Sequence, residues 1–324
     1  LTRSKLGDTM RIREILAMQK SRLLMKFQSS GHTTAVLRAM SYASPSSKLK
    51  DMTSGIEFYD KIAYIEEHFE EEKDVLVQEL QMLAHKLFRA DNMMISYTAA
   101  KEGLNDMEEL VEGLKEAMFE DPVEDTRCVL HCEMKNEGFK TASKVQYVAR
   151  VGNFIDNGAD YTGALQILKV ILSYDYLWQN IRVKGGAYGC MSGFSRTGEG
   201  YFVSYRDPNL ERTMEVYEGI ADYLRNFTVS DRDMNKYIIG TMSNIDQPMT
   251  PSAKGDRSFN LYMNKVSAET IKKERLQILE AGQEDIRKLA DVVEAVMKAE
   301  QVCVIGSEEK IEEAKDMFKN VTTF

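Results

Sequence analysis

The sequence predicts an α+β fold in which helices predominate. Three observations lead to this prediction: long runs with apolar residues at helical spacing, a few short β-type runs, and a helix–strand–helix pattern that occurs twice. The chain has 324 residues, which at roughly 100–200 residues per domain suggests two domains. Hydrophobic residues make up 43% and charged residues 29% of the chain, a composition that is typical of globular proteins and argues against disorder.

The first third of the chain is predicted to be mainly helical. An amphipathic run from about residue 8 to 29 closes at Ser29-Ser30-Gly31, which is a helix stop. A second helical run follows over residues 33–42, and apolar residues keep helical spacing from 55 to 89. Residues 93–97 (MMISY) predict a short buried strand.

The β-type runs lie mostly in the second half. Residues 144–151 (KVQYVARV) alternate well enough to predict a strand. Residues 162–180 are apolar nearly all round, which predicts a helix buried on several sides. Two further runs, residues 188–194 and 200–205, are joined by a turn containing Gly198 and predict a hairpin.

The repeated pattern suggests how these elements are organised. Residues 90–95 align with residues 299–304, and each run is preceded and followed by a helix. The copies agree in pattern rather than in identity, so chance similarity of two such units is the alternative. If the repeat is real, the second copy begins near residue 127 and the first copy lacks its front. Together with the absence of an initial Met, this predicts that the chain is the C-terminal piece of a larger protein.

Composition narrows the classes of partner and the compartment. The 42 Lys and Arg against 51 Asp and Glu give a net charge of −9, which disfavours a nucleic-acid partner. No apolar run approaches the roughly 18 residues of a membrane span, and no basic start leads into an apolar stretch as in a signal peptide. Four cysteines are too few for a disulfide framework, so we expect reduced thiols and a cytoplasmic location, such as a bacterial cytosol or an organelle matrix.

Residues 181–190 (IRVKGGAYGC) are the densest candidate for chemistry. A helix ends at a glycine pair and a strand starts at once. Phosphate-binding loops run from strand to helix, so this opposite order argues against a phosphate site. On the pattern alone, the simplest interpretation is a helix stop before a hairpin, with Arg182 and Tyr188 on the surface.

A second candidate is residues 204–210 (SYRDPNL), whose Asp207-Pro208-Asn209 is turn chemistry and a good start for a helix. Arg206 beside Asp207 could alternatively fix the loop through an ion pair.

Two motifs that could bind a metal are incomplete. His68-Phe69-Glu70-Glu71-Glu72 comes close to the inverted His-x-x-Glu-His motif, but Glu72 stands where a second His is needed. Cys128, His131 and Cys132 lack a second ligand pair downstream, and in a strand 128 and 131 would face opposite sides. We therefore expect no metal or cofactor bound by this chain.

Several of these segments together resemble the C-terminal half of presequence proteases, the falcilysin-like branch of the pitrilysin and insulin-degrading-enzyme zinc metallopeptidases. The resemblance covers nearly the whole chain, and residues 182–210 are its specific part. The segments that carry it are residues 29–32 (SSGH), 37–42 (LRAMSY), 144–148 (KVQYV), 174–178 (YDYLW), 181–190 and 205–210.

The resemblance implies a pitrilysin-type fold, with a mixed, largely antiparallel sheet, helices packed on one face, and one truncated copy of the domain. Residues 1–120 would be the mostly helical rear part of the third of four domains, and residues 121–324 the complete fourth domain.

The resemblance also implies a function. The chain would be the C-terminal fragment of a zinc metalloendopeptidase that degrades short unstructured peptides in an enclosed chamber. The zinc would be held by the N-terminal catalytic half of the same parent chain, so this fragment would be inactive alone. Arg182 and Tyr188 would be catalytic, facing the zinc and stabilising an oxyanion. Lys184, Gly185 and Gly186 would bind substrate, the glycines because they let a peptide backbone approach. The alternative is a non-catalytic peptide-binding or assembly module.

Overall fold

The computed structural model describes residues 4–124 and 128–324, which divide into two compact units. Unit 1 comprises residues 1–21, 60–128 and 247–268; unit 2 comprises residues 22–59, 129–246 and 269–324. Two helices, α1 (Thr9–Ser29) and α4 (Ile56–Glu67), contribute residues to both units. The domain boundary expected at residue 120 stays a prediction.

Unit 2 is built on one six-stranded sheet in the order β3-β4-β2-β5-β1-β6. The four strands from β3 to β5 pair antiparallel, whereas β1 pairs parallel with both β5 and β6. The expected α+β fold with a mixed, largely antiparallel sheet is therefore confirmed. The strands are β1 (Glu137–Thr141), β2 (Tyr147–Asn153), β3 (Gly189–Phe194), β4 (Glu199–Tyr205), β5 (Gln301–Ser307) and β6 (Asn320–Thr323).

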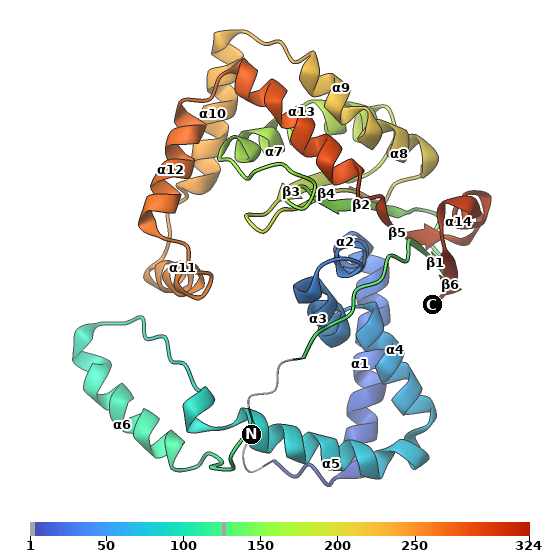
Figure 1. The fold of residues 1–324 in the computed structure, drawn as a ribbon. Helices are drawn as coiled ribbons and strands as arrows, with labels where there is room; N and C mark the ends of the chain where they lie inside the picture. The colour runs from blue at the N-terminus through green and yellow to red at the C-terminus, as the bar shows by residue number, and fades with distance from the viewer. Residues whose placement is uncertain (1–3, 125–127) are drawn as a thin grey trace. The chain divides into compact units, whose positions relative to one another are not determined.

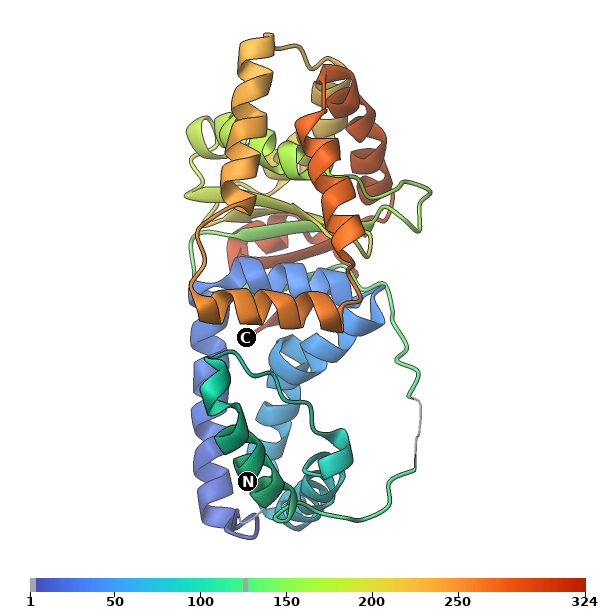
Figure 2. The same ribbon diagram turned by 90° about the vertical axis from the view of Figure 1, so that its left-hand side faces the viewer.

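One face of the sheet is covered by helices from the second half of the chain (Figures 1 and 2). The apolar sides of α7 and α13 pack on the strands, and α8 and α9 extend the same core. The helices of this part are α7 (Ala164–Tyr174), α8 (Glu211–Glu218), α9 (Ile220–Arg225), α10 (Asp231–Ile245), α12 (Ala268–Leu279), α13 (Gln283–Met297) and α14 (Glu308–Glu313).

The opposite face is covered by the N-terminal segment of unit 2. Helix α2 (Gly31–Ser41) contacts β2, β4 and β5, and α3 (Pro45–Ser54) packs beside α2. Because side chains alternate across a strand, Val148 of β2 enters the core under α7 and α13 while Tyr147 and Ala149 enter the core under α2. Helices thus lie on both faces, and α2 adds a layer that the resemblance did not lead us to expect.

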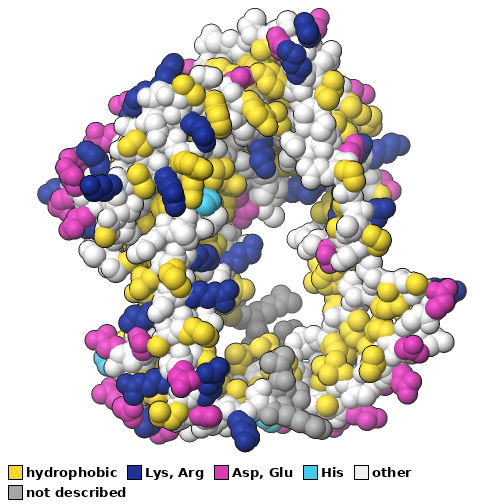
Figure 3. Space-filling model, turned by 180° about the vertical axis from the view of Figure 1, so that it is seen from behind, with side chains coloured by type: hydrophobic (Ala, Val, Ile, Leu, Met, Phe, Trp, Pro, Cys, Tyr) yellow, Lys and Arg dark blue, Asp and Glu magenta, His cyan; other side chains and the backbone are white. Residues whose placement is uncertain are grey.

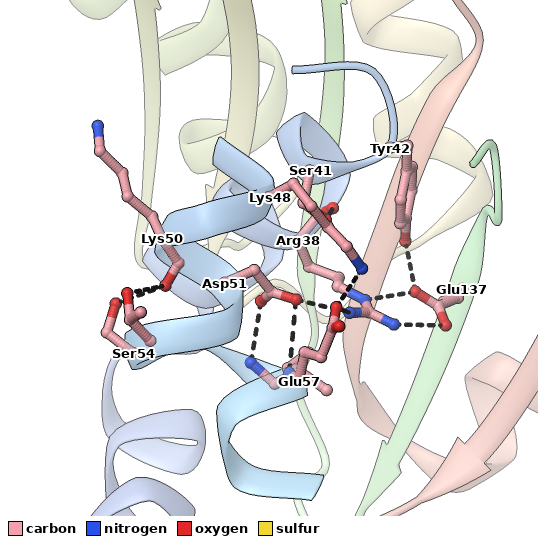
Figure 4. A network of polar contacts seen from close by, with 11 residues as sticks. Arg38, Ser41, Tyr42, Lys48, Lys50, Asp51, Ser54, Glu57 and Glu137 are labelled. Atoms are coloured by element: carbon pink, nitrogen blue, oxygen red, sulfur yellow. Dashed lines mark hydrogen bonds and ion pairs between the residues drawn. The ribbon is translucent and has the colours of Figure 1, made fainter. Parts of the chain in front are cut away.

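A buried polar network ties α2 and α3 to β1 (Figure 4). The guanidinium of Arg38 donates to Glu137 at 2.5 and 3.0 Å and to Asp51 at 2.6 Å. The Tyr42 hydroxyl donates to Glu137 at 3.0 Å, and the other Asp51 oxygen accepts the backbone N–H of Ile56 at 3.0 Å. Burial alone would lower the pKa of Arg38, but the two carboxylates outweigh burial and raise it. The network therefore holds a charged Arg38 inside the protein.

Unit 1 is helical in its described part. Its elements besides parts of α1 and α4 are α5 (Phe69–Leu87), α6 (Leu104–Lys115) and α11 (Pro251–Met263). Within this unit, α1 meets α4 and α5 through a Lys20–Glu66 ion pair of 2.6 Å and through Arg13, whose guanidinium lies 5.5 Å from the Phe69 ring centroid.

The expected strand at residues 93–97 is wrong. These residues follow a single 3₁₀ turn, Ala90–Asn92, and no strand of the described residues pairs with them. Only an isolated bridge between Arg89 and Phe119 forms nearby. The aligned residues 299–304, by contrast, run into β5, which has partners on both sides. A strand needs a neighbour to bond its backbone, so the two copies of the repeat differ at this element.

Within residues 4–124 and 128–324, no helix is both long enough and apolar enough to cross a membrane. On the face drawn in Figure 3, acidic and basic side chains are interspersed, with hydrophobic side chains between them.

Candidate functional site

The segment that leads to Arg182 is an unusual helix. Helix α7 ends at Tyr174, and the chain then forms a π-helix, η3 (Trp178–Val183), in which the N–H of Lys184 bonds to the carbonyl of Gln179 at 3.0 Å. The expected helix over residues 162–180 is therefore real, but it is broken at Asp175. A π-helix changes the angular spacing of side chains, and such segments are frequent at functional sites.

The glycine pair ends this helix as a Schellman motif. The N–H of Ala187 bonds to the carbonyl of Ile181 at 3.1 Å, and the N–H of Gly186 bonds to the carbonyl of Arg182 at 2.9 Å. Gly186 has φ +80°, a left-handed conformation in which other residues are strained. A Cβ on Gly185 would lie closer than 3.0 Å to the carbonyl oxygen of Ile181. The turn into β3 thus requires both glycines; their contact with substrate stays a prediction.

Arg182 and Tyr188 lie together on the surface of unit 2. The guanidinium of Arg182 lies 4.4 Å from the ring centroid of Trp178 and 5.3 Å from that of Tyr188, and its Nη1 donates to the backbone carbonyl of Tyr188. Arg182 is therefore held between two aromatic rings, an arrangement that favours a cation.

Tyr188 is fixed by its backbone while its ring remains accessible. Its N–H bonds to the carbonyl of Tyr205 at 3.0 Å, and the two rings meet edge to face with centroids 5.7 Å apart. Its side chain is 64% exposed, and its hydroxyl has no hydrogen-bond partner in the described part of the chain. Tyr205 in turn meets His32 edge to face at 4.8 Å, so a short aromatic row leads from Tyr188 to α2.

Lys184 does not join this pair through its side chain. Its ammonium reaches Asn180 at 3.4 Å, and it does so from an exposed position. The backbone of the loop is anchored from the next turn: the carbonyl of Lys184 accepts from Arg212 at 3.2 Å, and that of Gly185 accepts from the Asn209 amide at 2.6 Å.

The segment at residues 204–210 thus supports the glycine loop. Asp207 is buried and accepts from the Thr213 hydroxyl at 2.6 Å and from the Asn209 N–H at 2.9 Å. Burial raises the pKa of Asp207 in spite of these hydrogen bonds. Among the described residues, Arg206 forms no ion pair with Asp207; its guanidinium lies 5.5 Å from the Tyr205 ring centroid. The ion-pair alternative is therefore wrong.

The described residues do not fit a zinc site. His68 bonds to the carbonyl of Tyr64 at 3.0 Å, and Glu70 pairs with Lys73 at 2.6 Å. His131 and Cys132 lie in an irregular segment rather than in the expected strand. Over residues 4–124 and 128–324, no three His, Cys, Asp or Glu side chains gather where they could hold a metal ion.

Sequence reasoning did not single out Trp178 as a site residue. It stands four residues before Arg182 on a helix, a spacing that brings two side chains together. That spacing, in the only tryptophan of the chain, was the available signal.

Comparison with known proteins adds a separate line of observation. Residues 136–309 match the sequence family described as PreP C-terminal domain, and residues 1–65 match a family described as associated with peptidases of subgroup C of the M16 class. Protein HypA of Clostridium perfringens is 39% identical over 98% of this chain and 32% of its own length. Presequence protease 1, chloroplastic/mitochondrial, of Arabidopsis thaliana is 26% identical over 97% of this chain and 29% of its own length. The chain thus spans about a third of the length of these relatives.

Among solved structures, the crystal structure of pitrilysin superposes with a TM-score of 0.55 at 13% identity, covering 92% of this chain and 31% of the other. At this identity the likeness concerns the fold alone.

Proposed function

The chain belongs to the presequence protease family of M16 peptidases, and from this premise we propose that it is the C-terminal portion of a zinc metalloendopeptidase. The full protein would degrade short unstructured peptides in an enclosed chamber. Its N-terminal catalytic half would hold the zinc, and this portion would be inactive alone. The proposal is supported by the two family matches and by the share of the relatives' length that the chain spans.

The unpartnered hydroxyl of Tyr188 carries the catalytic part of the proposal. When a peptide carbonyl is attacked, its oxygen becomes negative and needs a hydrogen-bond donor. The Tyr188 hydroxyl is accessible and has no partner in the described part of the chain, while the backbone of the residue is fixed to β4. A donor that is held in place before the reaction loses little freedom in the transition state.

Arg182 would serve the same carbonyl in two ways. Its bond to the Tyr188 carbonyl and its position between Trp178 and Tyr188 orient the tyrosine. A guanidinium has five N–H donors, so further donors remain for a substrate carbonyl. Lys184, Gly185 and Gly186 lie just before Tyr188 in the chain and would contact the adjacent part of the peptide.

Removing the Tyr188 hydroxyl tests the proposal. In the full-length peptidase, Tyr188→Phe should lower kcat for an unstructured peptide by roughly 10²–10³, as expected for loss of an oxyanion donor. Tyr64→Phe, which removes a hydroxyl from another exposed tyrosine, should leave kcat unchanged. Unchanged turnover in Tyr188→Phe, with an unchanged unfolding midpoint, would exclude the catalytic role.

A second candidate is a non-catalytic peptide-binding or assembly module. It is favoured by the lack of a metal-holding group among the described residues. In that case Tyr188→Phe would weaken peptide binding, and no turnover would be measured with the wild-type full-length protein.

We also propose a cytoplasmic compartment, because all four cysteines are free thiols, as is usual where thiols are kept reduced.

A further inference from the structure

The outer strand of the sheet has an open edge beside the candidate site. Strand β3 is the first strand in the sheet order; it pairs with β4 on one side and with no strand of the described residues on the other. Its first three residues are partly exposed, whereas Ser192 and Gly193 are buried. The accessible part of the edge is therefore residues 189–191, directly after Tyr188. An exposed strand edge presents unpaired backbone N–H and carbonyl groups and can accept an added strand.

A pocket of about 610 Å³ opens at this same part of β3. It lies among α7, η3, α10 and the first half of β3, all within unit 2 (Figure 1). Trp178 is part of its wall and also carries the guanidinium of Arg182 on its ring, so the pocket is continuous with the candidate site.

The walls of this pocket combine apolar surface with one charge. Val170, Met191 and Ile245 supply apolar area, and Gln166 and Asn244 supply amides. Lys169 is the one charged residue among those that line the pocket, and no carboxylate lines it. Lys169 is exposed and forms no ion pair in the described part of the chain. In a chain whose net charge is −9, this pocket therefore favours an acidic group.

We propose that an extended peptide adds as a short strand to β3 at residues 189–191 and places an acidic side chain in this pocket, against Lys169. Backbone bonds to the strand edge give affinity that is independent of sequence, and the pocket beside the edge selects one side chain. A glutamate fits both kinds of wall, because its aliphatic stem contacts the apolar side chains while its carboxylate meets the ammonium. The inference rests on the proposed function, since it assumes that the ligand is a peptide.

The test uses fluorescence anisotropy with the 324-residue chain and a labelled unstructured peptide that contains one central Glu. On the wild-type chain, this peptide should bind about tenfold more tightly than its Gln counterpart. Lys169→Gln should bring the two affinities together, and Lys169→Arg should keep them apart. Lys288→Gln, a charge removal on the exposed surface of α13, is the matched control and should keep the wild-type ratio.

The backbone part is tested with two N-methylated versions of the Glu peptide, methylated at alternate residues. A peptide strand turns alternate N–H groups toward β3, so one version should lose about tenfold in affinity and the other should bind as before. Equal affinities of the two versions, or a Glu preference that survives Lys169→Gln, would overturn the inference and leave the proposed function standing. No binding of any of these peptides would also overturn it, while the proposed function is tested separately through turnover in Tyr188→Phe.

Discussion

The guanidinium of Arg182 lies 4.4 Å from the ring centroid of Trp178. The two residues are four positions apart, and the π-helix between Trp178 and Val183 sets the angle at which both side chains leave the backbone. Trp178 also forms part of the pocket beside β3, so a single indole ring supports Arg182 on one side and lines the pocket on the other. Position 178 is therefore expected to influence the site although it carries no catalytic group.

Trp178→Ala should release Arg182 from one of its two rings. A cation–π contact at an exposed position contributes about 0.5–1 kcal/mol, so we expect kcat/KM of the full-length peptidase to fall by roughly 2–5-fold. Trp178→Phe keeps a ring at this position and should lose less. Steady-state kinetics with one unstructured peptide would measure both effects. An equal loss in the two variants would argue that the indole acts by shape rather than by its contact with the cation.

The glycine pair makes two different predictions. Gly186→Ala meets only the Pro208 ring at 3.6 Å, so its cost is the strain of a positive φ, about 1–2 kcal/mol of unfolding free energy. Gly185→Ala should cost more, because its Cβ would collide with backbone carbonyl oxygen atoms that end the helix. Gly186→Asn should be milder than Gly186→Ala, since Asn tolerates the left-handed region. Urea denaturation of the three variants ranks them, and a larger loss for Gly186→Ala than for Gly185→Ala would contradict this account.

Local patterns predicted the elements around the site well, because these elements are determined by neighbours in the chain. The hairpin of β3 and β4 and the helix stop at Gly185 and Gly186 were both expected. The strand expected at residues 93–97 fails for the opposite reason: an apolar run becomes a strand only where another strand lies beside it, and none of the described residues provides one. Pairing is a tertiary property, and a run of five residues carries no information about it.

The contacts that hold α2 on the sheet were equally inaccessible to local reasoning. Arg38 and Glu137 are 99 residues apart in the chain, yet their side chains form a two-bond pair inside the protein. Nothing in the spacing of either residue marks it as buried, since isolated Arg and Glu are usually exposed. The same holds for the row from Tyr188 through Tyr205 to His32, which joins three separate segments.

The buried network predicts an asymmetric response to mutation. Glu137→Gln should destabilise the protein by about 3–5 kcal/mol, because it leaves the Arg38 charge buried with one carboxylate fewer. The double variant Arg38→Met, Glu137→Leu removes both charges and should be more stable than either single variant. Urea unfolding of the two single variants and the double variant completes a mutant cycle. Additive losses would mean that the Arg38–Glu137 pair contributes no coupling energy.

The site also predicts how stability depends on pH. Burial lowers the pKa of His32, whose Nδ1 is enclosed and has no hydrogen-bond partner in the described part of the chain. Below the ordinary value of 6.5, the unfolded chain therefore binds a proton at this position that the folded protein binds less readily. The contribution of His32 to the free energy of unfolding falls as pH drops below 6.5 toward its lowered pKa, and it is constant at higher pH.

His32→Phe keeps a ring beside Tyr205 and removes the titrating group, so it should remove this part of the pH dependence. The measurement is the difference in unfolding free energy between pH values of about 7.5 and about 5.5, taken from urea denaturation, for wild type and variant. His68→Gln, at an exposed position outside unit 2, is the control and should retain the wild-type difference. If His32→Phe retains it too, the proton is taken up elsewhere and His32 is not held neutral by the fold.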